Sequence, residues 1–180
     1  MKQNITQQKT SLTESVILIV EDDPINAAVI EDLLSGLYQS KTVTSGESAL
    51  SFCDTQLPDL ILLDVMMDGI SGLDTCKTLK SNSETQHIPI IFITSRHDHD
   101  DQNLCWEAGC VDFVDKPVNG VTLRNRIKAH LTLKLQTDLL RRMSFVDGLT
   151  GLYNRHLLDD VIGRLASQVN RSKQPLSLMM

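Results

Sequence analysis

Four short apolar segments of the chain lead into polar side chains of types that could share one reaction. These side chains are carboxylates, a hydroxyl and an ammonium group, namely Glu21, Asp22 and Asp23 after segment 16–20, Asp64 after 60–63, Thr94 after 90–93 and Lys116 shortly after 111–114. Carboxylate oxygens are ligands that Mg²⁺ prefers, and lysine pairs with carboxylates or with phosphoryl oxygens. The combination therefore predicts a site for a divalent cation and a phosphoryl group.

The apolar segments predict a parallel sheet that would bring these side chains together. Short, nearly continuous apolar runs are typical of strands buried on both faces, and here they alternate with helical patterns. We expect five strand–helix units, with strands at 16–20, about 41–44, 60–64, 90–93 and 111–114. This alternation predicts an α/β fold with a doubly wound five-stranded parallel sheet and helices on both faces. The polar groups would then lie at the carboxyl ends of the strands, where open α/β sheets build their sites.

Each polar group also has a purely structural interpretation. Asp22 and Asp23 could serve only the start of the helix that Pro24 begins, where negative charge is favourable. Thr94 could simply cap the helix that follows it. A carboxylate at Asp64, at the end of a buried strand, is costly unless it is paired or used as a metal ligand or nucleophile. Only the coincidence of all these groups at successive strand ends favours a shared site.

Composition narrows the classes of partner. The chain has 180 residues, 41% of them hydrophobic, and a formal net charge of −6, which argues against nucleic acid. No apolar run is long enough to span a membrane, and polar residues 1–14 predict a disordered segment without a signal peptide. The four cysteines form no CxxC pair and are expected to be reduced thiols. We therefore expect a soluble, cytoplasmic protein.

The last helix of the sheet domain is predicted to be unusually long. From about Val121 to Gly148 the sequence contains no intervening glycine or proline, and an apolar stripe recurs every four residues. The stripe consists of Ile127, Leu131, Leu135, Leu139 and Met143. Its second half has no sheet to cover, which suggests pairing with a second copy of the chain. The alternative is that it packs on the C-terminal segment of the same chain.

Residues 15–135 resemble a response-regulator receiver domain. The resemblance rests on VILIVEDDPIN at 16–26, LILLDVMM at 60–67, IIFITS at 90–95 and FVDKPV at 113–118. It implies a flavodoxin-like receiver fold. It also implies that Asp64 is the phosphoacceptor and that Mg²⁺ is held by Asp22, Asp23, Asp64 and the backbone carbonyl of Met66. Thr94 and Lys116 would bind the phosphoryl oxygens, and Phe113 would be the aromatic switch. The partner that supplies the phosphoryl group would be a histidine kinase or a phosphotransfer protein.

The chain departs from the family pattern in the loop after Asp64. The family often has proline where Asp68 stands and aspartate where Ser71 stands. The extra charge of Asp68 could weaken phosphorylation, add a contact near the metal, or be tolerated. Met66 and Arg96 stand at positions that tune the lifetime of the phosphoryl group in this family.

Residues 144–156, SFVDGLTGLYNRH, resemble the N-terminal signature of GGDEF domains, the diguanylate cyclases. We expect residues 1–14 to be a disordered segment, 15–132 a receiver domain, 133–146 a helical linker and 147–180 the incomplete start of a GGDEF domain. The GGDEF loop and the GTP pocket are absent from this sequence, so the chain itself would lack the cyclase active site. The resemblance implies a longer protein that condenses two GTP into cyclic di-GMP when phosphorylation favours a homodimer.

Two further hypotheses compete with a phosphorylated receiver that controls a cyclase. The first is a constitutive dimerisation module whose receiver is not phosphorylated. The main reason to consider it is the extra charge of Asp68. The second is a metal-dependent phosphatase with Asp64 as its nucleophile. That hypothesis is disfavoured because Met66 stands where a second catalytic aspartate would be needed.

Overall fold

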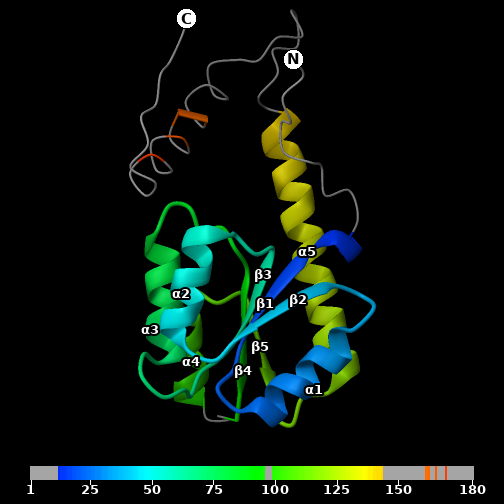
Figure 1. The fold of residues 1–180 in the computed structure, drawn as a ribbon, viewed down its shortest axis with the longest axis vertical. Coiled ribbons are helices and arrows are strands. Elements are labelled where there is room, and N and C mark those ends of the chain that lie inside the picture. The colour runs from blue at the N-terminus through cyan, green and yellow to red at the C-terminus, as the bar shows by residue number, and fades with distance from the viewer. Residues whose placement is uncertain (1–11, 96–98, 144–160, 163–164, 166–168, 170–180) are drawn as a thin grey trace, which may run out of the picture. The chain divides into compact units, whose positions relative to one another are not determined.

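The structure is a computed structural model of the chain, and it describes residues 12–95, 99–143, 161–162, 165 and 169 (Figure 1). The chain divides into two compact units, residues 1–134 and 135–180. The first unit holds a five-stranded sheet, and the described part of the second is helical. The GGDEF-like signature at 144–156 and Arg96 lie outside the described residues.

The first unit alternates strands and helices, as expected. In chain order its elements are β1 (Val16–Val20), α1 (Pro24–Leu34), β2 (Gln39–Val43), α2 (Gly46–Thr55), β3 (Leu60–Asp64), α3 (Gly72–Ser81), β4 (Ile90–Thr94), α4 (His99–Glu107), β5 (Asp112–Asp115) and α5 (Gly120–Met143). All strand pairs are parallel, and the strand order is β2-β1-β3-β4-β5. This arrangement confirms the predicted doubly wound parallel sheet.

Helices cover both faces of the sheet and bury its apolar strands between two cores. Figure 1 shows α1 and α5 on one face and α2, α3 and α4 on the other. The core beneath α1 and α5 includes Ile19 and Leu62, whereas the core beneath α2, α3 and α4 includes Leu18 and Leu63. Adjacent residues of one strand thus point into opposite cores, which explains why β1, β3 and β4 are apolar at almost every position.

The two edge strands differ from their predicted limits. β2 begins at Gln39, two residues earlier than expected, and its side chains are partly or fully exposed. β5 begins at Asp112 and ends at Asp115, one residue later than expected at each end. An edge strand has one neighbour and one open side, so its limits follow from pairing with that neighbour and leave a weak apolar pattern.

One local prediction needs correction, and the buried face of α1 is narrower than its apolar residues suggest. Leu12–Glu14 form a short 3₁₀ helix, with Leu12 packed against the core, so these residues do not belong to a disordered segment. In α1 the buried face consists of Ala27, Ile30 and Leu34. Ile25 and Val29 are apolar but lie outside that face, and they are 74% and 47% exposed.

Helix α5 is 24 residues long and changes character along its length. Leu123, Ile127 and Leu131 are fully buried against the sheet, which confirms the predicted packing of its first half. Further along, Leu139 and Leu140 are 59% and 67% exposed. Within the described part of the chain, no helix combines the length and the apolar character that a bilayer crossing requires.

Candidate functional site

The candidate site lies at the point in the sheet where the strand order reverses. From β1 the chain connects to β2 on one side and later to β3 on the other, so β1 and β3 are neighbours at the reversal point. Glu21 and Asp22 follow the end of β1, and Asp64 is the last residue of β3. Open α/β sheets place binding sites at this crevice, outside the carboxyl ends of the strands.

Three acidic side chains converge at this point. Glu21, Asp22 and Asp64 each place a carboxylate oxygen within 4.8 Å of the other two. Glu21 and Asp64 are only 1% and 5% exposed. Buried carboxylates repel one another unless a cation stands among them, so this cluster needs positive charge.

Lys116 supplies one positive charge. Its Nζ lies 2.7 Å from Asp64 Oδ2 and 3.0 Å from Glu21 Oε1. Burial by itself would lower the pKa of Lys116, but the hydrogen bonds and charges of Asp64 and Glu21 outweigh that effect and raise it above its ordinary value. Lys116 is therefore protonated at neutral pH and forms an ion triad in which the two carboxylates are buried and the lysine is half-buried. The peptide bond that joins it to Pro117 is cis.

The triad does not fully satisfy Glu21. Glu21 Oε1 accepts hydrogen bonds from Lys116 Nζ and from Asn26 Nδ2. Its second oxygen, Oε2, is buried and lies 2.9 Å from Lys116 Nζ, yet it receives no hydrogen bond of acceptable geometry. Burial accordingly raises the pKa of Glu21 above its ordinary value, despite the opposing hydrogen bonds. An incompletely paired oxygen beside two further carboxylates fits the hard oxygen ligand set that Mg²⁺ binds.

Asp23 has a different position from the one expected of a metal ligand. It is the N-cap of α1, where its side chain accepts hydrogen bonds from Ile25 N at 2.7 Å and Asn26 N at 3.2 Å. It is not part of the acidic cluster, and Glu21 stands there instead. The sequence could have indicated that Glu21, and not Asp23, belongs to the cluster. Glu21 directly follows a buried strand, whereas Asp23 directly precedes Pro24, the first residue of a helix.

The loop after Asp64 begins with a contact to the phosphoacceptor candidate. The backbone N–H of Met66 donates to Asp64 Oδ1 at 3.1 Å, while the side chain of Met66 is 55% exposed. Both oxygens of Asp64 therefore have a defined partner, Met66 N on one and Lys116 Nζ on the other. These contacts fix the carboxylate in one orientation.

Thr94 and Phe113 come from the two strands on the other side of Asp64. Thr94 ends β4, is 2% exposed, and its carbonyl oxygen accepts a hydrogen bond from Lys116 N at 2.8 Å. Phe113 lies in β5, and its ring meets Trp106 of α4 edge to face, with centroids 5.7 Å apart and planes at 68°. The sequence pattern did not predict this contact of Trp106, because Trp106 stands at an exposed helical position.

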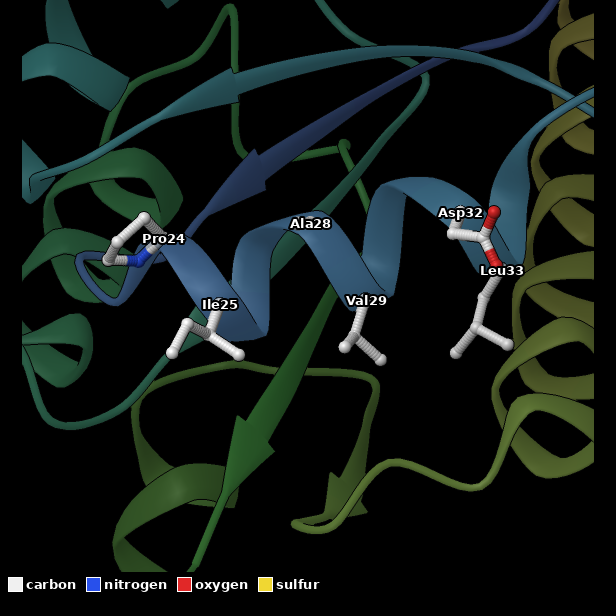
Figure 2. Close-up of a pocket in the computed structure, with 6 residues that line it drawn as sticks. All are labelled: Pro24, Ile25, Ala28, Val29, Asp32 and Leu33. Atoms are coloured by element: carbon white, nitrogen blue, oxygen red, sulfur yellow. The ribbon is translucent and has the colours of Figure 1, made fainter.

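Other candidate chemistry is weaker. All four cysteines are buried and none forms a disulfide in the structure, and burial raises the pKa of Cys110 to about 12. A shallow groove of about 490 Å³ lies along α1, where Figure 2 shows Ile25, Val29 and Leu33 projecting from one side of the helix. Asp32 is the one titratable group in its lining, so the groove carries no constellation for a reaction.

The fold and the acidic crevice together are those of receiver domains, and comparison with known families agrees. Residues 17–128 match the family model described as response regulator receiver domain. The chain belongs to this family.

Curated relatives include proteins of several architectures. A probable cyclic di-GMP phosphodiesterase of Vibrio cholerae is 39% identical over 129 residues, which cover 72% of this chain and 29% of the relative. Response regulator PleD of Caulobacter vibrioides is 36% identical over 165 residues, covering 85% of this chain and 36% of the relative. The chain thus spans about a third of the length of these two relatives. The polar-differentiation response regulator DivK of Brucella ovis is 34% identical and is covered over 98% of its length.

Solved structures with the same fold include isolated receiver domains. A putative response regulator from Chloroflexus aurantiacus has a TM-score of 0.64 and 33% identity, with 66% of this chain and 98% of that chain covered. The receiver domain of sensor histidine kinase PA1611 from Pseudomonas aeruginosa has a TM-score of 0.62 and 28% identity over 66% and 98% of the two chains. In that structure a magnesium ion is coordinated in the active site cleft.

Proposed function

We propose that this chain is a phosphoryl-accepting switch whose phosphoacceptor is Asp64. The single observation that carries the proposal is the pair formed by Lys116 Nζ and Asp64 Oδ2, 2.7 Å apart in a buried crevice at the sheet edge. A carboxylate oxygen of Asp64 would form the new bond to phosphorus while the bond between phosphorus and the donor's leaving group breaks. The lysine beside it offsets the negative charge of the incoming phosphoryl group.

We propose Glu21, Asp22, Asp64 and the backbone carbonyl of Met66 as the residues that hold Mg²⁺. This set replaces Asp23 with Glu21, because Asp23 is engaged in capping α1 and Glu21 has a buried oxygen without a hydrogen bond. When bound, Mg²⁺ would supply positive charge to the phosphoryl oxygens as they approach the carboxylates. Asp64, with one oxygen toward Met66 N and the other toward Lys116, is already oriented for that approach.

Thr94 and Lys116 are the proposed partners of the phosphoryl oxygens. They end or follow neighbouring strands, and their backbones are joined by the hydrogen bond from Lys116 N to the Thr94 carbonyl. A movement of Thr94 toward the phosphoryl group would therefore be transmitted to β5. Phe113 lies in β5 and would turn inward as the switch residue, leaving its contact with Trp106.

The proposed output is control of cyclic di-GMP synthesis through a homodimer. The match with response regulator PleD covers 85% of this chain, which is more than the 134 residues of the first unit, so it extends into residues 135–180. One solved relative is the signal receiver domain of a modulated diguanylate cyclase from Desulfovibrio desulfuricans, with 31% identity and a TM-score of 0.60. Exposed Leu139 and Leu140 supply an apolar surface on α5 for pairing with a second copy.

The proposed phosphoryl donor is a histidine kinase or a phosphotransfer protein. A small donor such as acetyl phosphate tests the switch without that partner. With Mg²⁺ present, the wild type should take up one phosphoryl group and Asp64→Asn none. Sedimentation of the phosphorylated chain should then show a shift from monomer toward dimer, and the double substitution Leu139→Glu and Leu140→Glu should abolish that shift without reducing phosphoryl uptake. Uptake without any change in sedimentation would refute the dimer and leave the phosphoacceptor intact.

A further inference from the structure

The loop between β3 and α3, residues 65–71, is closed on itself at its base. The backbone N–H of Gly72 donates to the carbonyl of Val65 at 3.1 Å. A Cβ atom at Gly72 would stand 2.0 Å from the carbonyl oxygen of Asp64, so the backbone of α3 begins in direct contact with the end of β3. The shape of this loop therefore decides where Met66 and its carbonyl lie relative to Asp64.

Two carboxylates from other elements hold the middle of the loop. Glu47, in the first turn of α2, accepts a hydrogen bond from the backbone N–H of Ile70 at 3.2 Å. Asp22, after β1, accepts one from the backbone N–H of Asp68 at 3.2 Å. The second contact requires a residue with an N–H, which a proline at position 68 would lack. The loop is thus fixed to α2 on one side and to a member of the acidic cluster on the other.

The start of α2 and the loop also approach each other closely. Gly69 has a φ of +83°, and a Cβ atom there would stand 2.8 Å from Glu47 Oε1. A Cβ at Gly46 would stand 3.1 Å from the carbonyl oxygen of Ile70. The positive φ favours glycine at Gly69, and the 3.1 Å approach at Gly46 shows that the start of α2 packs tightly against the loop backbone. The contact between Glu47 and the loop is therefore part of a close-fitted arrangement.

We propose that Glu47 is a positioning residue for the phosphoryl-transfer site. Its carboxylate holds the loop 65–71 in the shape that places the Met66 carbonyl and orients Asp22 for the divalent cation. The inference rests on the proposed function of the acidic cluster. Glu47 itself does not belong to that cluster, and it acts through the loop backbone.

Glu47 is suited to this role because it remains an acceptor at working pH. Hydrogen bonds from its own backbone N–H, from Ser45 and from the backbone of Ile70 lower the pKa of its carboxyl. The carboxylate is therefore ionised near pH 7 and can accept from Ile70. An amide at this position would keep an accepting oxygen, whereas alanine would keep none.

Three variants separate this role from general effects on α2. Glu47→Ala removes the acceptor, and Glu47→Gln keeps an acceptor but removes the charge that the helix N-terminus favours. Asp54→Ala removes one exposed carboxylate from the other end of the same helix and serves as the matched control. Because Glu47 stands at the surface, Glu47→Ala is expected to fold, which circular dichroism checks.

The measurements are amide hydrogen exchange of residues 66–70 without metal, and the dissociation constant for Mg²⁺ from titration calorimetry. In Glu47→Ala we expect faster exchange at Ile70 and Asp68 and Mg²⁺ binding weakened by about tenfold, the size typical for residues that orient ligands. Glu47→Gln and Asp54→Ala should remain within about twofold of wild type. Unchanged exchange in Glu47→Ala would overturn the inference, and so would faster exchange with unchanged Mg²⁺ affinity. A wild-type chain that binds no Mg²⁺ would instead refute the proposed function of the acidic cluster.

Discussion

Lys116 and Asp64 stand 52 residues apart in the sequence, and their side chains meet at 2.7 Å between Nζ and Oδ2. Glu21 joins them from a third element at 3.0 Å. Two buried carboxylates and a half-buried ammonium group thus meet at the carboxyl ends of the strands of an otherwise apolar sheet. Such an arrangement is costly to stability unless its members pair well, and its presence is typical of sites selected for chemistry.

Replacing Lys116 should lower the stability of the fold, because the buried carboxylates then lose their cation. Lys116→Met leaves Glu21 and Asp64 buried without their cation, and we expect a loss of about 2–3 kcal/mol in the free energy of unfolding at pH 7. Urea denaturation without metal measures it. The same substitution in a Glu21→Gln background should cost clearly less, because one of the two carboxylates is then neutral. An equal loss in both backgrounds would show that Glu21 is not coupled to Lys116.

The raised pKa of Glu21 predicts how stability depends on pH. Because its folded-state pKa lies above the ordinary value of 4.5, the folded chain binds this proton more tightly than the unfolded chain does. The stabilising contribution of the protonated group is complete below pH 4.5 and is lost as the pH rises through the folded-state pKa. Glu21→Gln should therefore be more stable than wild type at pH 8 without metal, and this advantage should shrink as the pH falls toward 4.5. Thermal unfolding in EDTA across this range checks the sign, and an advantage that grows toward low pH would contradict it.

Glu21 and Asp23 provide a matched pair for the metal site. Glu21→Gln and Asp23→Asn each remove one negative charge within three residues of the chain. Asparagine caps helices as well as aspartate does, so Asp23→Asn should fold normally and bind Mg²⁺ with nearly wild-type affinity. Glu21→Gln should bind it more than about tenfold more weakly. The reverse order in titration calorimetry would restore Asp23 to the metal site.

Trp106 gives an optical signal for the proposed switch. It is the one tryptophan of the chain, and its ring contacts Phe113 edge to face at 5.7 Å. If Phe113 turns inward on phosphorylation, the surroundings of the indole change, and its emission should shift. In Phe113→Leu the shift should be strongly reduced while phosphoryl uptake, followed by mass, remains. A full shift in Phe113→Leu would mean that the signal does not report on Phe113.

Most of the fold could be predicted from the sequence because the buried strands consist of apolar residues. β1, β3 and β4 are buried at every position and were predicted to within a residue. β2 was less well predicted, since an edge strand is defined by its neighbour; the pairing of Gln39 with Val16 is not visible in the residue types of 39–43. The difference between Ile25, which is exposed, and Ile30, which is buried, likewise depends on the direction in which α1 lies on the sheet.

The kind of site could be predicted from the sequence, but not all of the residues that form it. The strand-end rule brought Asp64, Thr94 and Lys116 to one edge of the sheet. It did not separate three consecutive acids, because the cap of α1 and the cluster differ only by the turn that the chain makes after Val20. Glu47 and Trp106 were missed for a related reason. Each contacts the site region from a helix with no motif around it, and only the packing of α2 and α4 reveals those contacts.

The most direct test of the central claim is the intact mass of the chain after incubation with acetyl phosphate and Mg²⁺. Wild type, Asp64→Asn and the control Asp54→Asn should be compared, each with and without EDTA. We predict one added phosphoryl group on wild type and Asp54→Asn, none on Asp64→Asn, and none on any chain when EDTA removes the metal. Uptake by Asp64→Asn equal to that of wild type, or no uptake by wild type where another receiver domain is labelled, would contradict the assignment of Asp64 as the phosphoacceptor.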